Sequence, residues 1–476
     1  MNRLLALVVL LLLLTAGTAA AQIEEEEMLP PLSSTSVHDP SVIRVGDTYY
    51  VFGSHLAAAK STDLRNWQAV ESRVHDENKL IPNVYTELAE VFAWAQTDTL
   101  WAPDVVQLPD GRFYMYYCAC RGDSPRSALG VAVADHIEGP YKNLGIMLFS
   151  GGLRAADGSV YDANKHPNVV DPHVFFDADG RLWMVYGSYS GGIFILELDP
   201  ETGFPLPNQG YGTRLAGGNH SRIEGPYILY NPDLDYYYLF LSFGGLAAQG
   251  GYNIRVARSR TPTGPYLDAQ GQSMLDAHGP RGSFFDDAAI EPYGVKLVGN
   301  FLMRSGRGYY GYVSPGHNSA YHDPETGRYF LIMHTRFPRA GEYHEVRTHQ
   351  LFFNEDGWPV LSVLPYAYET IAPVSLADVV GDYLYINHGK DISSRMKTAV
   401  GITLNADGTI SGGASGVWHL VAEYFAHLEI EGELYKGVFV SQWDPSALAR
   451  VMTFTAVSDS GVAVWGKGHL REPGAP

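Results

Sequence analysis

One short pattern, repeated five times, constrains the fold of this chain more than any other feature. In each copy an ionisable residue precedes a strand-like run, a turn, and a second run rich in aromatic residues. The ionisable residues, at intervals of 65, 67, 53 and 93 positions, are Asp39, Asp104, Asp171, Glu224 and His317. Further strand-like runs follow in the same units, for example residues 130–134 and 253–257. Short runs broken by Gly, Asp and Pro, without long helical periodicity, indicate an all-β protein.

Units of this size, with about four strands each, predict a five-bladed β-propeller over residues 33–365. The first strand of each blade lines the central channel, so the five ionisable residues are expected to converge on one axis. A β-sandwich with similar hairpins is the alternative. A repeat that serves packing alone, however, gives no reason for an ionisable group at the same point of every unit.

The pattern changes after about Leu364. Short strands separated by Gly turns continue through residues 366–476 and predict a small C-terminal β-barrel. No paired acid and base is evident there, so this domain is expected to be accessory.

The first 21 residues have the features of a secretory signal peptide: Arg3, an apolar run over residues 4–14, and a terminal Ala19-Ala20-Ala21. The apolar run is too short to favour the alternative, an uncleaved membrane anchor. Residues 22–32 then form an acidic leader. We therefore expect a secreted or periplasmic protein that has no membrane contact after cleavage.

The net charge of the chain narrows the choice of binding partners and substrates. The chain has 33 Lys and Arg against 52 Asp and Glu, a net charge of −19. Such an acidic chain disfavours nucleic acid, anionic lipid and polyanionic substrates such as polygalacturonate, and favours a neutral substrate.

Cys118 and Cys120 stand two positions apart on one side of a strand-like run, which is poor disulfide geometry. We expect them to be small buried residues.

Three of the ionisable residues suit glycoside hydrolysis. This reaction needs a carboxylic acid that protonates the leaving oxygen and a carboxylate on the opposite side of the sugar. Glu224 lies between apolar neighbours, which raise a carboxyl pKa, and is the predicted acid. Asp39, between His38 and Pro40, is the predicted base. Asp171 is the third member, whose charge would help to keep the acid protonated.

Each of these residues has a plainer explanation. Asp39 and Asp171 both precede Pro, where a lone Asp commonly serves a turn. Asp104 is as compatible with a structural role as with a functional one. His317 could bind a metal, hydrogen-bond the acid pair, or be structural. Motifs for a serine nucleophile, a zinc helix or a nucleotide loop are not found in the sequence.

The segments that carry these residues resemble glycoside hydrolase family forty-three, and within it the endo-α-1,5-L-arabinanases. They cover the whole predicted propeller in order. The matching segments are His38-Asp39-Pro40-Ser41-Val42, Trp101-Ala102-Pro103-Asp104-Val105, Asn168-Val169-Val170-Asp171-Pro172, Gly187-Ser188-Tyr189-Ser190-Gly191-Gly192, His220-Ser221-Arg222-Ile223-Glu224-Gly225-Pro226-Tyr227 and Gly316-His317-Asn318-Ser319. The tail is similar to the lipocalin-like barrel of the longer arabinanases.

The resemblance implies an inverting enzyme that cuts internal linkages of arabinan, the neutral side chain of pectin. Asp39 would be the base, Glu224 the acid, and Asp171 the residue that tunes and positions the acid. It also implies one Ca²⁺ on the axis near His317, held largely through waters. We expect the enzyme to be a monomer. The positions implied to contact arabinose units are Trp101, Asn168, Ser188, Tyr189, Ser190, His220, Ser221 and Arg222.

Two departures from the family pattern concern subsite detail. Val169-Val170 replaces a more usual Ala-Ile, and the loop over residues 117–126 carries the two cysteines. Two other functions stay open. One is an exo-acting α-L-arabinofuranosidase or β-xylosidase on the same scaffold, for which residues 267–316 could wall off one end of the channel. The other is a sugar-binding propeller without activity, against which the three carboxylates in motif positions argue.

Overall fold

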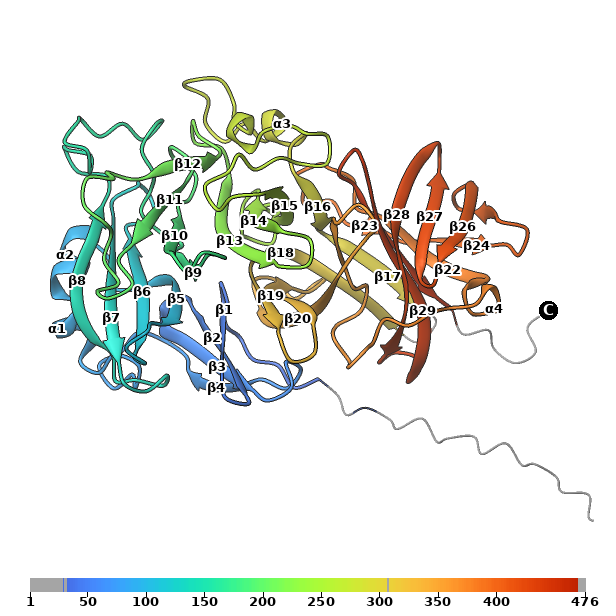
Figure 1. The fold of residues 1–476 in the computed structure, drawn as a ribbon, viewed down its shortest axis with the longest axis horizontal. Helices are drawn as coiled ribbons and strands as arrows, with labels where there is room; N and C mark the ends of the chain where they lie inside the picture. Colours follow the sequence, from blue (N-terminus) through green and yellow to red (C-terminus); the bar gives the residue numbers. More distant parts are fainter. Residues whose placement is uncertain (1–28, 30–31, 306–307, 470–476) are drawn as a thin grey trace, which may run out of the picture.

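The computed structural model describes residues 29, 32–305 and 308–469. Five antiparallel sheets stand around a common axis, and a closed barrel of eight strands follows at the C-terminal side (Figure 1). The prediction of an all-β fold with a five-bladed propeller and a C-terminal barrel is confirmed. The predicted signal peptide and most of the acidic leader lie outside the described residues.

The first four blades each contain four strands, which follow one another from the axis outward. Blade one comprises β1 (Ser41–Val45), β2 (Thr48–Gly53), β3 (Ala57–Ser61) and β4 (Gln68–Glu71). Blade two comprises β5 (Trp101–Gln107), β6 (Phe113–Cys120), β7 (Ser127–Ala134) and β8 (Lys142–Phe149). Blade three comprises β9 (His173–Phe176), β10 (Leu182–Tyr186), β11 (Ile193–Leu198) and β12 (Thr213–Ala216). Blade four comprises β13 (Ile223–Asn231), β14 (Tyr236–Phe243), β15 (Asn253–Ser259) and β16 (Val295–Val298).

Blade five is larger than the repeat predicts. Its strands are β17 (Phe301–Ser305), β18 (Gly308–Asp323), β19 (Arg328–Arg336), β20 (His344–Phe353) and β21 (Pro359–Leu361). The long strand β18 pairs with β17 through its first half and with β19 through its second half. A short strand, β23 (Lys397–Thr398), adds to β17 in parallel. This sheet therefore has six strands and extends from the propeller towards the barrel.

The ring closes between the first and last blades. The inner strands β1, β5, β9, β13 and β18 contact one another in that order, and β18 contacts β1. The segment before β1 joins both blades across this seam. The carbonyl of Ser33 accepts from the Trp67 N–H at 2.8 Å, and that of Thr35 accepts from the Val346 N–H at 3.0 Å. The Ser34 hydroxyl donates to the Val346 carbonyl at 2.8 Å.

Two helices that the repeat pattern does not predict connect blades one and two. They are α1 (Val84–Glu87) and α2 (Ala89–Ala95). Their apolar residues recur at helical spacing, and Val84, Leu88 and Val91 are fully buried. The remaining helical turns are η1 (Ser54–Leu56), η2 (Met274–Asp276), α3 (Asp287–Ile290) and α4 (Leu376–Val379). Among the described residues, no helix has the length and apolar character needed to span a membrane.

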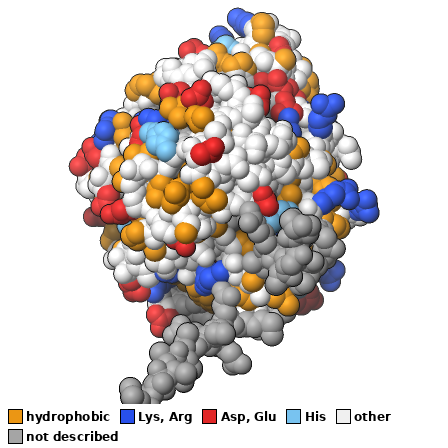
Figure 2. Space-filling view, turned by 90° about the vertical axis from the view of Figure 1, so that its right-hand side faces the viewer, with side chains coloured by type: hydrophobic (Ala, Val, Ile, Leu, Met, Phe, Trp, Pro, Cys, Tyr) orange, Lys and Arg blue, Asp and Glu red, His pale blue; other side chains and the backbone are white. Residues whose placement is uncertain are grey.

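The barrel is filled by its own side chains. Its strands are β22 (Gly381–Asn387), β24 (Val400–Leu404), β25 (Thr409–Gly412), β26 (Gly416–Ala422), β27 (Phe425–Ile430), β28 (Glu433–Asp444), β29 (Ala449–Ser458) and β30 (Ala463–Gly468). Strand β22 pairs with both β24 and β30, which closes the barrel. Inside it, Tyr383, Trp418, Phe439 and Phe454 form one buried cluster with aliphatic neighbours. On the face shown in Figure 2, acidic, basic and hydrophobic side chains are interspersed.

Two buried polar side chains join the propeller to the barrel. Gln442 of β28 accepts from the backbone N–H groups of Val363 and Leu364, at 3.0 and 3.2 Å. Its amide donates to Glu369 at 3.2 Å, and Glu369 also accepts from the Ala367 N–H at 2.7 Å. Both side chains are fully buried. Burial raises the pKa of Glu369 from its ordinary 4.5 to about 7, against the lowering effect of these hydrogen bonds.

This raised pKa predicts a pH-dependent stability at the junction. The folded state holds the Glu369 proton more tightly than the unfolded state, so the benefit is complete below pH 4.5. It is lost as the pH rises to about 7. Glu369→Gln imitates the protonated form, and should gain about 3 kcal/mol of stability relative to wild type over this interval. Denaturant unfolding of both proteins at several pH values measures this gain, and a constant difference would contradict the prediction.

Candidate active site

A cleft of about 320 Å³ opens at the propeller axis and is lined by residues of all five blades. The lining residues are His38, Asp39, Ser54, His55, Trp101, Asp171, Ser188, Glu224, Leu246, His317 and His344. The three predicted carboxylates and His317 therefore meet in one place, although they come from four different blades. Asp39, Asp171 and Glu224 are each less than a tenth exposed.

The loop before β1 holds Asp39 in a dense set of contacts. One carboxylate oxygen accepts from the Ser54 hydroxyl at 2.5 Å and lies 2.7 Å from His38 Nδ1. The other lies 3.1 Å from His317 Nδ1. Burial acts to raise the pKa of Asp39, but the charges and hydrogen bonds of His38 and His317 hold it well below its ordinary value. Asp39 is thus held in its ionised form, the form that a general base requires.

Glu224 stands at the start of β13 and has the opposite character. Its two oxygens accept from the Ser188 and Tyr252 hydroxyls, each at 2.8 Å. Burial raises the pKa of Glu224, and the charge of Asp39 adds to this effect, while His317 and the two hydroxyls oppose it. Two carboxyl groups in one cleft whose pKa values are displaced in opposite directions fit an acid and a base.

Asp171 and His317 complete the charge arrangement. Asp171 accepts from the Gly225 N–H at 3.2 Å, directly beside Glu224. Burial, helped by the charges of Glu224 and Asp39, raises the pKa of Asp171 to about 7. Burial disfavours the charged imidazole of His317, but Asp39 and Asp171 raise its pKa to about 9. One buried cation therefore balances part of the charge of three carboxyl groups.

The backbone at these positions has uncommon torsion angles. The φ angles are 56° at Asp39, 56° at Asp171 and 42° at His317, in the left-handed region that residues other than Gly rarely adopt. Gly225, beside Glu224, has a φ of 58°. A Cβ at this glycine would lie 3.0 Å from the His317 ring. Such strain gathers where a site fixes its side chains.

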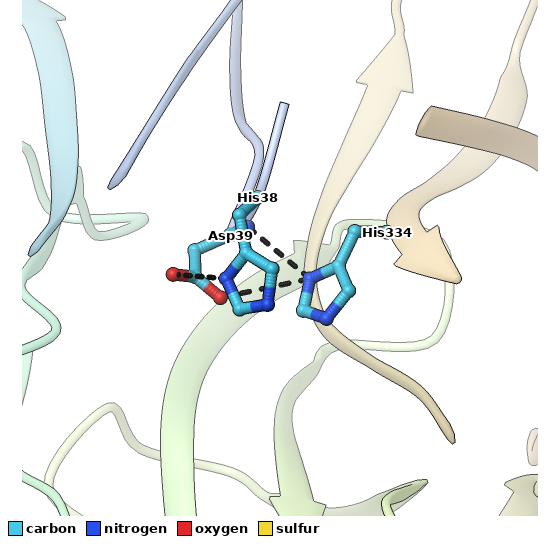
Figure 3. A group of neighbouring side chains, drawn as sticks. All are labelled: His38, Asp39 and His334. Atoms are coloured by element: carbon cyan, nitrogen blue, oxygen red, sulfur yellow. Dashed lines mark hydrogen bonds and ion pairs between the residues drawn. The ribbon is translucent and has the colours of Figure 1, made fainter. Parts of the chain in front are cut away.

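Asp39 also lies beside two histidines, His38 and His334, and Figure 3 shows the three side chains together. The rings of His38 and His334 stack at 3.8 Å, and His334 Nδ1 accepts from the Asp39 N–H at 3.2 Å. One ligand atom from each of His38, Asp39 and His334 lies within 4.8 Å of the others, which would suit a transition metal. The lone pair of His334 Nδ1 is already used by the backbone, so we interpret this group as a hydrogen-bonded network.

Asp104 does not line the cleft. It is 2% exposed, accepts from the Ser41 hydroxyl of blade one, and accepts from the Val174 N–H of blade three at 2.6 Å. These contacts tie three inner strands together. Of its two possible roles, the structure therefore favours the structural one. The expected convergence at the cleft holds for the other four ionisable residues.

The positions implied to contact substrate divide into two groups. Trp101 and Ser188 line the cleft. Six others are not among the residues that line it: Asn168, Tyr189, Ser190, His220, Ser221 and Arg222. Asn168 accepts from the Ser127 hydroxyl, and Arg222 forms an ion pair with Asp287. Ser221 has a buried hydroxyl without a partner among the described residues.

Sequence reasoning missed several residues of the site. Ser54, His55, Leu246 and His344 line the cleft, and Tyr252 contacts Glu224 from the segment between β14 and β15. Ser54 and His55 directly follow the aromatic strand of the first unit, so their position in the repeat is the sequence signal that could have identified them. Cys118 and Cys120 are free and buried, as expected.

Oxygen atoms that could take part in cation binding lie near His317. The next two residues of β18 carry a buried Asn318 Oδ1 and a buried Ser319 Oγ, neither of which has a hydrogen-bond partner among the described residues. Ca²⁺ prefers carboxylate, amide and water oxygens. These unpartnered oxygens, directly beside His317 in the sequence, are of the types that Ca²⁺ prefers, and in this respect the residues fit the predicted calcium ion.

Comparisons with known proteins agree with this geometry. The extracellular endo-alpha-(1->5)-L-arabinanase 2 of Bacillus subtilis is 62% identical over 439 residues, which cover 92% of this chain and 94% of that protein. The crystal structure of a family 43 glycoside hydrolase from Bacillus licheniformis matches with a TM-score of 0.91 at 61% identity, covering 93% of this chain and all of that one. The endo-1,5-alpha-L-arabinanase of Thermotoga petrophila matches with a TM-score of 0.90 at 53% identity and the same coverage.

The family comparison covers both domains. Residues 28–289 match Glycosyl hydrolases family 43, and residues 363–466 match its C-terminal lipocalin-like domain. The first match spans more than half of the chain and includes Asp39, Asp171 and Glu224. The chain therefore belongs to glycosyl hydrolases family 43 and carries that family's C-terminal lipocalin-like domain.

Proposed function

We propose that this glycoside hydrolase is an exported endo-α-1,5-L-arabinanase that acts with inversion at the anomeric carbon. The observation that carries the proposal is the meeting of Asp39, Asp171 and Glu224, from three different blades, in one buried cleft. The lowered pKa of Asp39 and the raised pKa of Glu224 support the assignment of base and acid. The names of the two arabinanases compared above supply the substrate and the endo mode. The predicted signal peptide and the word "extracellular" in the Bacillus subtilis name support export.

The reaction assigns one step to each carboxyl group. Asp39 accepts a proton from a water molecule, whose oxygen attacks the anomeric carbon of the arabinosyl unit. Glu224 gives its proton to the glycosidic oxygen as the bond to the anomeric carbon breaks. The hydroxyls of Ser188 and Tyr252 fix the orientation of Glu224. Asp171 lies next to it, and because two neighbouring carboxylates repel, this pair of carboxyl groups tends to retain a proton until the substrate arrives.

A calcium ion would be held near His317 by the carboxylates of the cleft, by Asn318 and Ser319, and by water. When bound, it supplies positive charge among the carboxyl groups. In the steps above, the protein's own side chains move the protons: Asp39 moves one and Glu224 moves the other.

The mode of attack is tested by the product profile on linear 1,5-α-arabinan. An endo enzyme shortens the polymer at once and yields a ladder of oligosaccharides, and proton NMR of the first products should show inverted anomers. Release of single arabinose units from the start would favour the exo-acting alternative and would contradict the endo assignment.

The acid assignment is tested by Glu224→Gln. We expect kcat on arabinan to fall about 10²–10⁴-fold, because proton donation contributes that much. The matched control is an aryl arabino-oligosaccharide with a nitrophenolate leaving group, which needs little protonation and should lose far less. Asp39→Asn, in contrast, should lose activity on both substrates. Equal losses by Glu224→Gln on the two substrates would rule out the acid role.

The calcium proposal is tested by removing the metal from the wild-type protein. Chelation followed by gel filtration should lower both arabinan hydrolysis and the melting temperature, and added Ca²⁺ should restore both. His317→Ala is the matched variant, and its melting temperature should no longer respond to Ca²⁺. A metal-free protein with unchanged melting temperature and activity would leave His317 with a purely structural role.

A further inference from the structure

The backbone of Asp39 needs a partner to hold it. Its φ of 56° lies in the left-handed region, which is unfavourable for residues other than Gly. The direction of the carboxylate depends on this torsion angle, because a return to extended backbone would swing the side chain away. Something in the surrounding structure must therefore stabilise the unusual conformation.

His334 of β19 provides the contact. Its Nδ1 accepts from the Asp39 N–H at 3.2 Å and lies 3.6 Å from the carboxylate. The two residues are 295 positions apart in the sequence, and the ring is fully buried. An imidazole nitrogen that accepts from an N–H group is unprotonated, so the ring is neutral and carries its proton on Nε2.

The same ring is a neighbour of one partner of each catalytic carboxyl group. It stacks on His38 at 3.8 Å between ring centres, and His38 contacts the carboxylate of Asp39. It also lies nearly parallel to Tyr252, at 6.1 Å between ring centres, and Tyr252 donates to Glu224. His334 thus connects the two halves of the site without lining the cleft itself.

The environment of the second ring nitrogen, Nε2, indicates that the contact made by Nδ1 is the reason for a histidine at this position. His334 Nε2 is buried and has no hydrogen-bond partner among the described residues. An unpaired buried N–H group lowers stability, and an apolar side chain of similar size would avoid that cost. If the ring served packing alone, a histidine here would be unfavourable. The compensating contact is the one made by Nδ1.

We propose that His334 is a positioning residue for the base: its Nδ1 holds the Asp39 N–H, and with it the left-handed backbone that directs the carboxylate into the cleft. The proposal rests on the proposed role of Asp39 as the base. It assigns His334 no contact with substrate.

A pair of substitutions with the same number of side-chain atoms tests it. His334→Asn places Oδ1 where Nδ1 was, since both atoms stand on Cγ, and keeps the acceptor. His334→Leu places a methyl group there. Both lose the ring and its stacking, so they differ only in polarity. Kinetics on linear arabinan should give the Leu variant a kcat about ten- to a hundredfold below that of the Asn variant, at similar KM.

Stability supplies a readout that separates positioning from structure. A buried amide is less favourable than a buried Leu, so the melting temperature of the Asn variant should be equal to or below that of the Leu variant. The expected order of kcat is the reverse of this. His334→Gln, whose amide lies one bond further out, should behave as the Leu variant does, and it provides the measurement if the Leu variant does not fold.

The outcomes distinguish this proposal from the proposed function. Equal kcat for the Asn and Leu variants would overturn the positioning role, whatever Asp39 does. Full activity of Asp39→Asn would overturn the base assignment first. One tightly bound zinc ion per purified wild-type chain, lost in all three His334 variants, would instead show that His334 is a metal ligand and would also overturn the proposal.

Discussion

The burial of three carboxyl groups around one imidazole is the condition on which the rest of this structure depends. Removing several negative charges from water is unfavourable unless they are paired, hydrogen-bonded or protonated. The protein uses all three solutions at once. Asp39 is paired with His38 and His317, Glu224 accepts two hydroxyl hydrogen bonds, and burial displaces the pKa of Asp171 to about 7. Different solutions for similar groups are what give them different chemistry.

The propeller makes this arrangement possible because each blade contributes little. Each blade supplies one ionisable residue from its inner strand or from the loop before it, and only closure of the ring brings these residues together. Support comes from outside the cleft. Asp104 ties the inner strands of the first three blades, and the Ser54 hydroxyl accepts from the Ala102 N–H of blade two while it donates to Asp39. Each carboxyl group is therefore held in part by a blade other than its own: Asp39 by His317, Asp171 by Gly225 and Glu224 by Ser188.

Much of this could be predicted from the sequence, because the repeat places one ionisable residue in or just before the inner strand of each blade. That register alone identifies Asp39, Asp171, Glu224 and His317 as neighbours. It does not identify Tyr252 or His334, which lie in or beside later strands of their blades and have the pattern of ordinary core residues. The repeat also does not predict the six-stranded fifth sheet, because β18 has two register shifts and pairs with different strands along its length. The helices α1 and α2 have the periodicity but are too short to stand out.

The seam between blades one and five has a consequence for how the enzyme is made. Ser34 and Val346, which meet there, are 312 positions apart, so blade one cannot complete the seam until blade five has been synthesised. Until then the segments that carry Glu224 and Asp39 remain in separate parts of an open chain. The cleft can therefore form only after the last blade has been synthesised and the ring has closed.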